Sequence, residues 1–309
     1  MHISYFAMTT PIASKSDQYW KMLLNLSTAA TSSAGSSTGS STEPKTLTAE
    51  DQAWIESAID ELNTENTPVS LMTSYMMDIK SKLVERKYTS IPDAVTIENE
   101  IAQITEYCYD RDIAMGFCRM GGIGLAEEIL SKTAEVRSQK CVAELVVAIA
   151  QNNPEVQDQI NETSILELLI KCVNDEAIAP YDRKFFVSAI SAVVRNNKRC
   201  FDKFIELNGF IKLASIALKA DRRRQEVLLN RICIALTNIA RGLEQKDIED
   251  KRINWTLAET LLAVELDTTE GIDYLIQYFR ALKPEESYLS ADCWEMLNRK
   301  LDEYTLMTS

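Results

Sequence analysis

The chain of 309 residues contains a single histidine, His2. Ser/His/Asp and Cys/His catalysis, and metal sites built from histidine, are therefore excluded. Glycine and proline are also scarce, with nine and seven residues, and alternating runs of β-branched residues are rare. From these shortages we expect an all-α protein that carries no metal and no other cofactor.

Long hydrophobic runs are missing as well. No stretch approaches the ~18 to 20 apolar residues of a membrane span, and the opening MHISYFAMTT lacks the basic and apolar regions of a secretory signal. The seven cysteines are odd in number, widely spaced and without a C-x-x-C pair. That usage is typical of small buried side chains in a reducing compartment. We therefore expect a cytoplasmic protein, with the nucleus as the alternative compartment.

Positive charge is in deficit, because 33 Lys and Arg face 46 Asp and Glu, for a net charge of −13. Nucleic acid and anionic membranes attract positively charged proteins, so neither is expected as a partner. A basic protein surface is the more natural match. A local basic cluster, KADRRR at Lys219–Arg224, is interpreted as the solvated face or leading turn of a helix.

What the chain does contain is an internal repeat. Three related phrases, IAQNN, VVRNN and NIARG, each close a long helix-like segment, with Gln151, Arg195 and Arg241 at corresponding positions. Their spacings are 195 − 151 = 44 and 241 − 195 = 46 residues, within the ~40 to 47 of armadillo and HEAT repeats. The expected fold is thus an all-α, armadillo-like helical repeat solenoid, in which stacked units complete one another's core.

Two glycine pairs support the same period. Gly122-Ile123 and Gly209-Phe210 are 209 − 122 = 87 residues apart, close to two repeats. We expect each pair to open the same helix of its unit. A phosphate-binding loop is not expected at the first pair, because no strand precedes it and no Gly-Lys-Ser/Thr follows.

Composition divides the chain into three regions. Residues 1–47 are predicted to be a flexible N-terminal segment, in which the short amphipathic helix DQYWKMLLNLS precedes a Ser/Thr/Gly-rich stretch at 31–46. Residues 48–91 are predicted to form an N-terminal helical cap, because amphipathic periodicity returns there. Residues 92–309 are predicted to hold the repeats and a C-terminal cap.

The candidate binding surface is a polar stripe that runs beside the aliphatic core stripe of each long helix. In a solenoid the last helix of each unit lines the concave surface. The polar stripe consists of Cys141, Glu144, Ala148, Gln151, Phe185, Ser188, Ala192, Arg195, Arg231, Ile234, Asn238 and Arg241. For any one of these residues, a helix-terminal or inter-helix hydrogen bond is the alternative role.

Four segments together resemble one family. They are DRDIAMGFCRMGGI, VRSQKCVAELVVAIAQNNPEVQDQI, DRKFFVSAISAVVRNNKRCFDKFIELNGF and NRICIALTNIA, starting at Asp110, Val136, Asp182 and Asn230. In order and content they resemble the armadillo-type nucleotide exchange factors of 70-kDa heat-shock chaperones. The resemblance covers roughly residues 19–30 and 48–309, and no single motif in it is diagnostic.

The resemblance implies a non-enzymatic, monomeric cochaperone. Its concave face would hold lobe two of the chaperone's ATPase domain and displace lobe one, so that ADP and then the client leave. The chaperone-binding residues would be Ala114, Glu144, Gln151, Phe185, Ser188, Arg195, Arg231, Ile234, Asn238 and Arg241.

Some residues match the family's pattern individually. Ala114 matches a small residue at the contact surface, where bulk would block docking, and Arg231 matches a basic residue that suits an acidic patch of the partner. In the N-terminal segment, Trp20, Leu23 and Leu24 would be the apolar core of a client mimic. The chain departs from the family in having only Glu244–Thr269 for a full fourth repeat, which predicts a shortened fourth repeat.

Two other classes of function compete with this interpretation. An armadillo adaptor that binds an extended peptide would need successive asparagines, but Ala148 and Ala192 stand where Asn238 does, which favours the exchange factor. An enzyme would need a carboxylate pair such as Glu127 and Glu128. Adjacent helical residues point ~100° apart, so this pair is a weak candidate.

Overall fold

The computed structural model describes residues 67–85, 91–133, 135–219, 222–242, 252–263, 270–283 and 287–308. These residues belong to one compact unit, Asp60–Ser309. Within them the chain forms helices and no strand. The expected N-terminal segment, with Trp20, Leu23 and Leu24, and the first part of the expected cap lie outside the described residues.

The chain begins, as far as it is described, with two helices and then repeats a three-helix unit. The first two are α3 (Pro68–Val84) and α4 (Ile91–Tyr107). The three-helix units are α5 (Arg111–Arg119), α6 (Gly122–Lys132) and α7 (Val136–Ala150); α8 (Pro154–Asn161), α9 (Ile165–Asn174) and α10 (Pro180–Val194); and α11 (Lys198–Glu206), α12 (Gly209–Lys219) and α13 (Arg222–Arg241). The last helices are α14 (Arg252–Ala263), α15 (Glu270–Ala281) and α16 (Ala291–Thr308).

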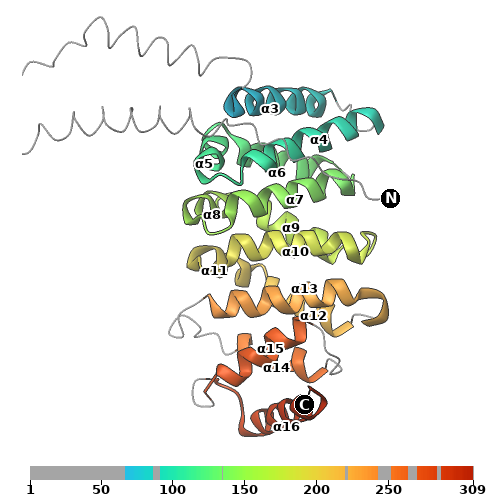
Figure 1. The fold of residues 1–309 in the computed structure, drawn as a ribbon, viewed down its shortest axis with the longest axis vertical. Coiled ribbons are helices and arrows are strands. Elements are labelled where there is room, and N and C mark those ends of the chain that lie inside the picture. The colour runs from blue at the N-terminus through green and yellow to red at the C-terminus, as the bar shows by residue number, and fades with distance from the viewer. Residues whose placement is uncertain are drawn as a thin grey trace, which may run out of the picture. The chain divides into compact units, whose positions relative to one another are not determined.

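Helices of the same rank pack on one another in successive units. The third helices α7, α10 and α13 form one layer together with α4 before them and α15 after them. In this layer, called the third-helix layer, each helix contacts the next in that order, and Figure 1 shows them stacked along the long axis. A second layer runs through α6, α9, α12, α14 and α16, again neighbour to neighbour. The predicted helical repeat solenoid is therefore confirmed.

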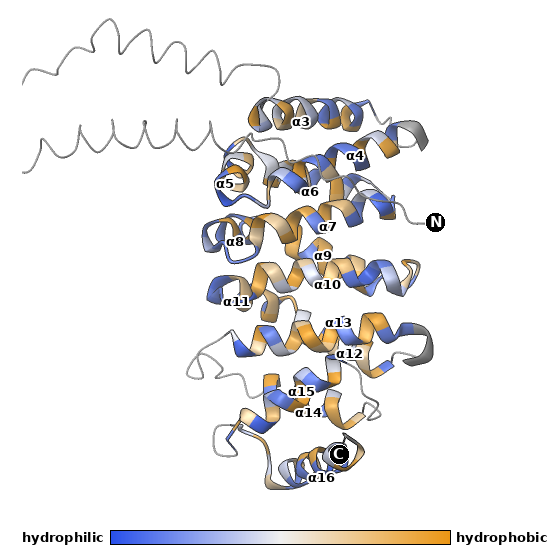
Figure 2. Ribbon diagram, in the orientation of Figure 1, coloured by the Kyte–Doolittle hydropathy of each residue, from blue (hydrophilic) through white to orange (hydrophobic). Residues whose placement is uncertain are grey.

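The third helices carry their core on one side only. Figure 2 shows that α7, α10 and α13 each mix hydrophobic and hydrophilic residues. Their predicted core stripes, represented by Val146, Ile190 and Leu236, have no exposed surface. Full burial of such a side chain stabilises a fold by about 1.5 to 3 kcal/mol. All seven cysteines are unpaired and all but Cys141 are buried, which confirms that six of them are small core residues.

The repeated phrases QNN and RNN are turns as well as repeat markers. After α7, Gln151 (φ −62°, ψ 117°) and Asn152 (φ 56°) form a type II turn, closed by the bond from Asn153 N to Ala150 O at 3.1 Å. After α10, Arg195 (φ −62°, ψ 131°) and Asn196 (φ 60°) do the same, closed by Asn197 N and Val194 O at 3.3 Å. Such turns need a positive φ at the third position, which asparagine tolerates.

The two predicted helix-opening glycines occupy the same place in their units. Gly122 begins α6 and Gly209 begins α12, so each opens the second helix. A Cβ atom would lie 2.3 Å from the Phe117 ring at the first and 2.2 Å from the Phe204 ring at the second. Both rings are fully buried, and so only glycine lets the helix approach them.

The end of the stack differs from its middle. Two helices, α11 and α12, separate α10 from α13, whereas the described residues between α13 and α15 contain α14 alone. Residues 243–251 are outside the described ranges. The shortened fourth repeat therefore stays a prediction. Over the described residues, no helix combines the length and the apolar character that a membrane crossing requires.

Carboxyl groups and a lysine join α3 to α4. The Glu100 side chain is 12% exposed and lies 3.5 Å from Lys82 Nζ, and Asp78 contacts both residues. Burial and the hydrogen bond to Asp78 raise the pKa of Glu100 from 4.5 to about 7, against the opposing charge of Lys82. Ionisation of Glu100 therefore destabilises this contact between α3 and α4.

Two glycines of α6 should respond in opposite ways to alanine. Gly122→Ala should lower the free energy of unfolding by about 1 to 3 kcal/mol, because the methyl group overlaps the buried Phe117 ring. Gly124→Ala, two residues on, meets nothing within 4 Å and should raise it by about 0.5 to 1 kcal/mol. Chemical denaturation of both variants tests this, and a loss of stability in Gly124→Ala would contradict it.

The Glu100 contact should make stability depend on pH. The folded pKa lies above the unfolded one, so this contribution is complete below about pH 4.5 and is lost as the pH rises through about 7. Glu100→Gln removes the titration. Its free energy of unfolding relative to the parent should rise by about 1 to 3 kcal/mol between pH 5 and pH 8. Denaturation at both pH values, with the exposed Glu106→Gln as control, checks the sign, and a flat difference would refute the assignment.

Candidate functional site

Part of the polar stripe lines a pocket of about 160 Å³ between α7, α10 and α13. Stripe residues that line the pocket are Gln151, Ser188, Ala192, Arg195, Arg231, Ile234 and Asn238. Three adjacent helices from three units therefore line one pocket, and the stripe residues in it stand at the 44- and 46-residue spacings of the sequence.

Four further residues line the pocket but are not part of the stripe predicted from the sequence. They are Val147, Asn152, Ser191 and Ala235. Ser191 carries a signal that could have found it, because it stands three residues after Ser188 and four before Arg195 on one helical face. Asn152 lines the pocket because the type II turn folds it back beside Gln151.

The pocket is electrostatically one-sided. No acidic residue lines it, while both Arg195 and Arg231 do. Both arginines are exposed, and neither side chain has an ion-pair partner within the described parts of the chain. Guanidinium groups bind carboxylates through paired hydrogen bonds, and the hydroxyl and amide groups nearby add further donors. The pocket thus suits an acidic group of a partner and offers no nucleophile with an adjacent base.

Four stripe residues of α7 and α10 lie outside the pocket, and three of them, Cys141, Glu144 and Phe185, are nearer the start of their helix than the residues of that helix that line the pocket. Lys140 Nζ lies 4.4 Å from the centre of the Phe185 ring, and Lys184 Nζ lies 5.0 Å from it. Glu144 is exposed on the same side, and desolvation raises its pKa despite these two lysines. Cys141 and Ala148 are partly buried. Cations and an aromatic ring therefore extend the pocket surface along the layer.

Arg241 has the alternative role that the sequence left open. Its guanidinium donates to Tyr274 O at 3.4 Å and lies 5.8 Å from the centre of the Tyr274 ring. Tyr274 belongs to α15, so this stripe residue makes an inter-helix contact. Arg241 helps to attach the last third helix to the layer, although its side chain stays exposed.

The expectation for Ala114 is corrected by its burial. Ala114 was expected at the contact surface, but it is 0% exposed and belongs to the core. It lies in α5, four residues after the N-cap Asp110, and the corresponding residues Gln157 and Phe201 of α8 and α11 are buried too. Packing covers this position in all three units, and a partner cannot reach it.

The two glutamates of the enzyme alternative are engaged in separate contacts. Glu127 Oε1 accepts hydrogen bonds from Ser164 N at 2.7 Å and Ser164 Oγ at 2.6 Å, which lower the pKa of Glu127. Glu128 instead pairs with Lys132 on its own helix at 2.5 Å. Glu127 therefore links α6 to the start of α9, and Glu128 makes an ion pair within α6. The two glutamates do not form a carboxylate pair.

Comparison with known proteins gives one sequence relative and several structural ones. No family model matches the chain. The Hsp70 nucleotide exchange factor FES1 of Scheffersomyces stipitis is 30% identical over 123 residues, which are 40% of this chain and 41% of that protein. The chain therefore matches about two fifths of the length of this curated relative.

The structural relatives are designed armadillo repeat proteins. YIII(Dq)4CqI and YIII(Dq.V1)4CPAF, the latter in complex with the peptide (KR)4, each have a TM-score of 0.55 and 16% identity, covering 75% of this chain and 99% of theirs. A computationally designed protein for modular peptide recognition has a TM-score of 0.52 and 18% identity, covering 75% and 87%. At such identities the likeness concerns the fold alone, and the fold is armadillo-like.

The burial of Ala114 and the exposure of Arg231 predict different effects on stability. Ala114→Arg should lower the free energy of unfolding by at least about 3 kcal/mol, because an unpaired charge enters the core. Arg231→Ala should change it by no more than about 0.5 kcal/mol. Thermal or chemical unfolding of the two single variants decides this. Parental stability in Ala114→Arg would mean that this position is open to the surface after all.

Proposed function

We propose that the protein is a non-enzymatic cochaperone, which binds the ATPase domain of a 70-kDa heat-shock chaperone and promotes the release of ADP and then of client. The observation that carries the proposal is the pocket with Arg195 and Arg231, built from segments that resemble exchange factors. The partial identity to FES1 supports the same assignment.

The proposed mechanism is differential binding. A factor accelerates ADP release only if it binds the opened ATPase domain more tightly than the closed one. A tenfold preference corresponds to about 1.4 kcal/mol. The third-helix layer suits this task because its face is set by packing of buried side chains and changes little on binding, so its shape selects one arrangement of the two lobes.

Lobe two is proposed to present an acidic group to the pocket. Arg195 and Arg231 come from different helices and different units, so both can contact one carboxylate or two adjacent ones. Such contacts contribute most where both partners are desolvated on binding. The pocket therefore acts as the anchor of a larger interface, and the cations beside Phe185 extend it toward α7.

The second candidate is an adaptor that binds an extended peptide without affecting nucleotide. Designed armadillo relatives include one in complex with (KR)4. In the corresponding layer here Lys140 lies 4.0 Å from Asp182 and beside Glu144, so its charge is offset, whereas the pocket arginines Arg195 and Arg231 have no acidic neighbour in the lining and would repel a basic peptide. An acidic peptide is the version of this alternative that fits the charges.

The proposed function predicts faster ADP release in the presence of the full chain. Labelled ADP bound to a purified cytosolic 70-kDa chaperone should leave at least about tenfold faster, and Arg195→Glu with Arg231→Glu should remove most of this gain, a loss of about 1.4 kcal/mol or more. The matched control is Lys132→Glu with Arg299→Glu, which makes the same change in net charge at exposed positions of α6 and α16.

The outcomes separate the candidates. Unchanged ADP release with a folded protein would reject the exchange function, and binding of the chaperone or of an acidic peptide without faster release would favour the adaptor. Equal losses in the pocket variant and its control would show that the pocket is not the contact. Circular dichroism and unfolding of every variant confirm that the comparison is made between folded proteins.

A further inference from the structure

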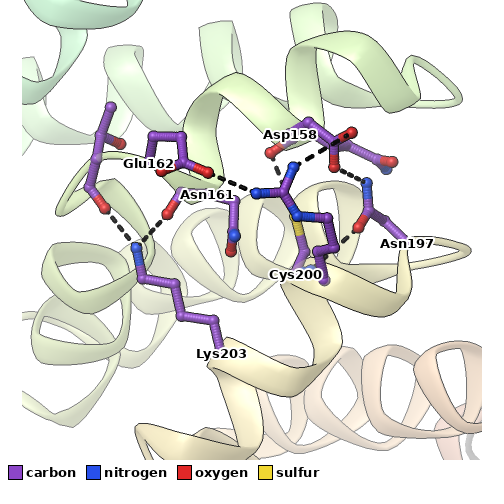
Figure 3. Close-up of polar contacts among 9 residues, drawn as sticks. Asp158, Asn161, Glu162, Asn197, Cys200 and Lys203 are labelled. Carbon is purple, nitrogen blue, oxygen red and sulfur yellow. Dashed lines mark hydrogen bonds and ion pairs between the residues drawn. The ribbon is translucent and has the colours of Figure 1, made fainter.

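The second and third units are joined by polar contacts between α8 and α11. Figure 3 shows side chains of α11 reaching toward α8, with Asn197, Cys200 and Lys203 on one side and Asp158, Asn161 and Glu162 on the other. Lys203 Nζ donates to Asn161 O at 2.5 Å and to Thr163 O at 2.7 Å, Cys200 Sγ donates to Gln157 O at 3.2 Å, and Arg199 pairs with Glu162 at 2.7 Å. These contacts set α8 firmly against the next unit.

One side chain of α8, that of Gln157, contacts the end of α10 rather than α11. Gln157 Nε2 donates to Ala192 O at 2.8 Å and to Arg195 O at 3.1 Å. The residue is 3% exposed. The last carbonyls of a helix have no partner within the helix, so this amide supplies the bonds that the end of α10 needs. Both carbonyls belong to residues that line the pocket.

The same turn is held from its other end. Asn197 Nδ2 donates to Asp158 Oδ1 at 3.0 Å, and Asn197 Oδ1 accepts from Cys200 N at 3.0 Å. Arg195 and Asn196 lie between the bonded carbonyl of Ala192 and Asn197, and the carbonyl of Arg195 is bonded as well. The backbone that carries the Arg195 side chain is thus bonded to adjacent residues of α8, Gln157 and Asp158.

The preceding unit lacks this arrangement. Its turn ends in Asn153, whose Nδ2 contacts Met115 Sδ at 3.5 Å and whose Oδ1 is buried without a partner. Sulfur is a weak acceptor compared with a carboxylate. The residues that correspond to Gln157 are Ala114 in α5 and Phe201 in α11, whose side chains have no hydrogen-bonding group. Of the three corresponding positions, that of Gln157 alone can hold a turn through a side-chain amide.

We infer that Gln157 is a positioning residue for Arg195 in the pocket. The inference rests on the proposed function, because it assigns Gln157 a role in presenting one of the two pocket arginines to the acidic partner group. Gln157 is buried beneath the pocket and does not contact the partner. By fixing the carbonyls of Ala192 and Arg195, it restricts the directions open to the Arg195 side chain before binding, and preorganisation of this kind improves affinity.

The first test needs no partner. Gln157→Met keeps the length of the side chain and removes both donated hydrogen bonds. Amide hydrogen exchange over residues 192–197 of the full chain should become about tenfold faster, whereas exchange over the turn at 151–153 should not change. Asp202→Ala, which removes an exposed ion pair with Lys198 inside α11, is the control and should leave both turns as they are. Unchanged exchange at 192–197 would overturn the inference.

The second test measures coupling to the partner. In a double-mutant cycle of chaperone binding, Gln157→Met should raise Kd about three- to tenfold in the parent and in Arg231→Ala, but not in Arg195→Ala. General loosening of the fold would lower binding equally in both arginine backgrounds. Equal effects there would overturn the positioning role even though the proposed function stands. A parent chain that fails to bind would reject the proposed function, while hydrogen exchange still decides whether Gln157 holds the turn.

Discussion

The packing of each third helix on the next is the constraint on which the rest of the structure depends. No unit buries its apolar stripe alone, so α7, α10 and α13 must lie side by side. Once they do, residues on the uncovered side recur in register across three units. The pocket exists because of this register: lining residues of neighbouring helices are at least 36 positions apart in sequence (188 − 152 = 36 and 231 − 195 = 36) and yet share one surface.

The turns between units convert that packing into a defined surface. A type II turn after α7 and another after α10 reverse the chain within two residues, which places Gln151 and Arg195 at equivalent edges of the pocket. The two turns share their backbone but differ in support. Asn153 faces a sulfur atom where Asn197 faces a carboxylate. The same backbone turn is therefore held by different bonds in the two units, and the turn bonded to an amide and a carboxylate is the one that carries a charge.

The period of the repeat and its core stripes could be predicted because both are properties of local sequence. The same reasoning found seven pocket residues, and it could have found Ser191 from helical spacing. It could not find Gln157, whose bonds join residues 35 and 38 positions away. It misplaced Ala114, because a small side chain suits a contact surface and a crowded core equally well. Nor could it choose between the two roles of Arg241, which depend on where α15 lies.

Charge shows most clearly why a whole-chain property is a poor guide to a site. A net charge of −13 indicates a basic partner, whereas the pocket contains two arginines and no acidic residue. Both statements are physically sound, but they act over different distances. At physiological ionic strength, charges more than about 8 Å away are largely screened. A group that docks in the pocket would therefore be attracted or repelled by Arg195 and Arg231 rather than by the net charge of the chain. The distant acidic surface instead opposes nonspecific binding of polyanions, so in the proposed function the pocket would select an acidic group that also fits the shape of the layer.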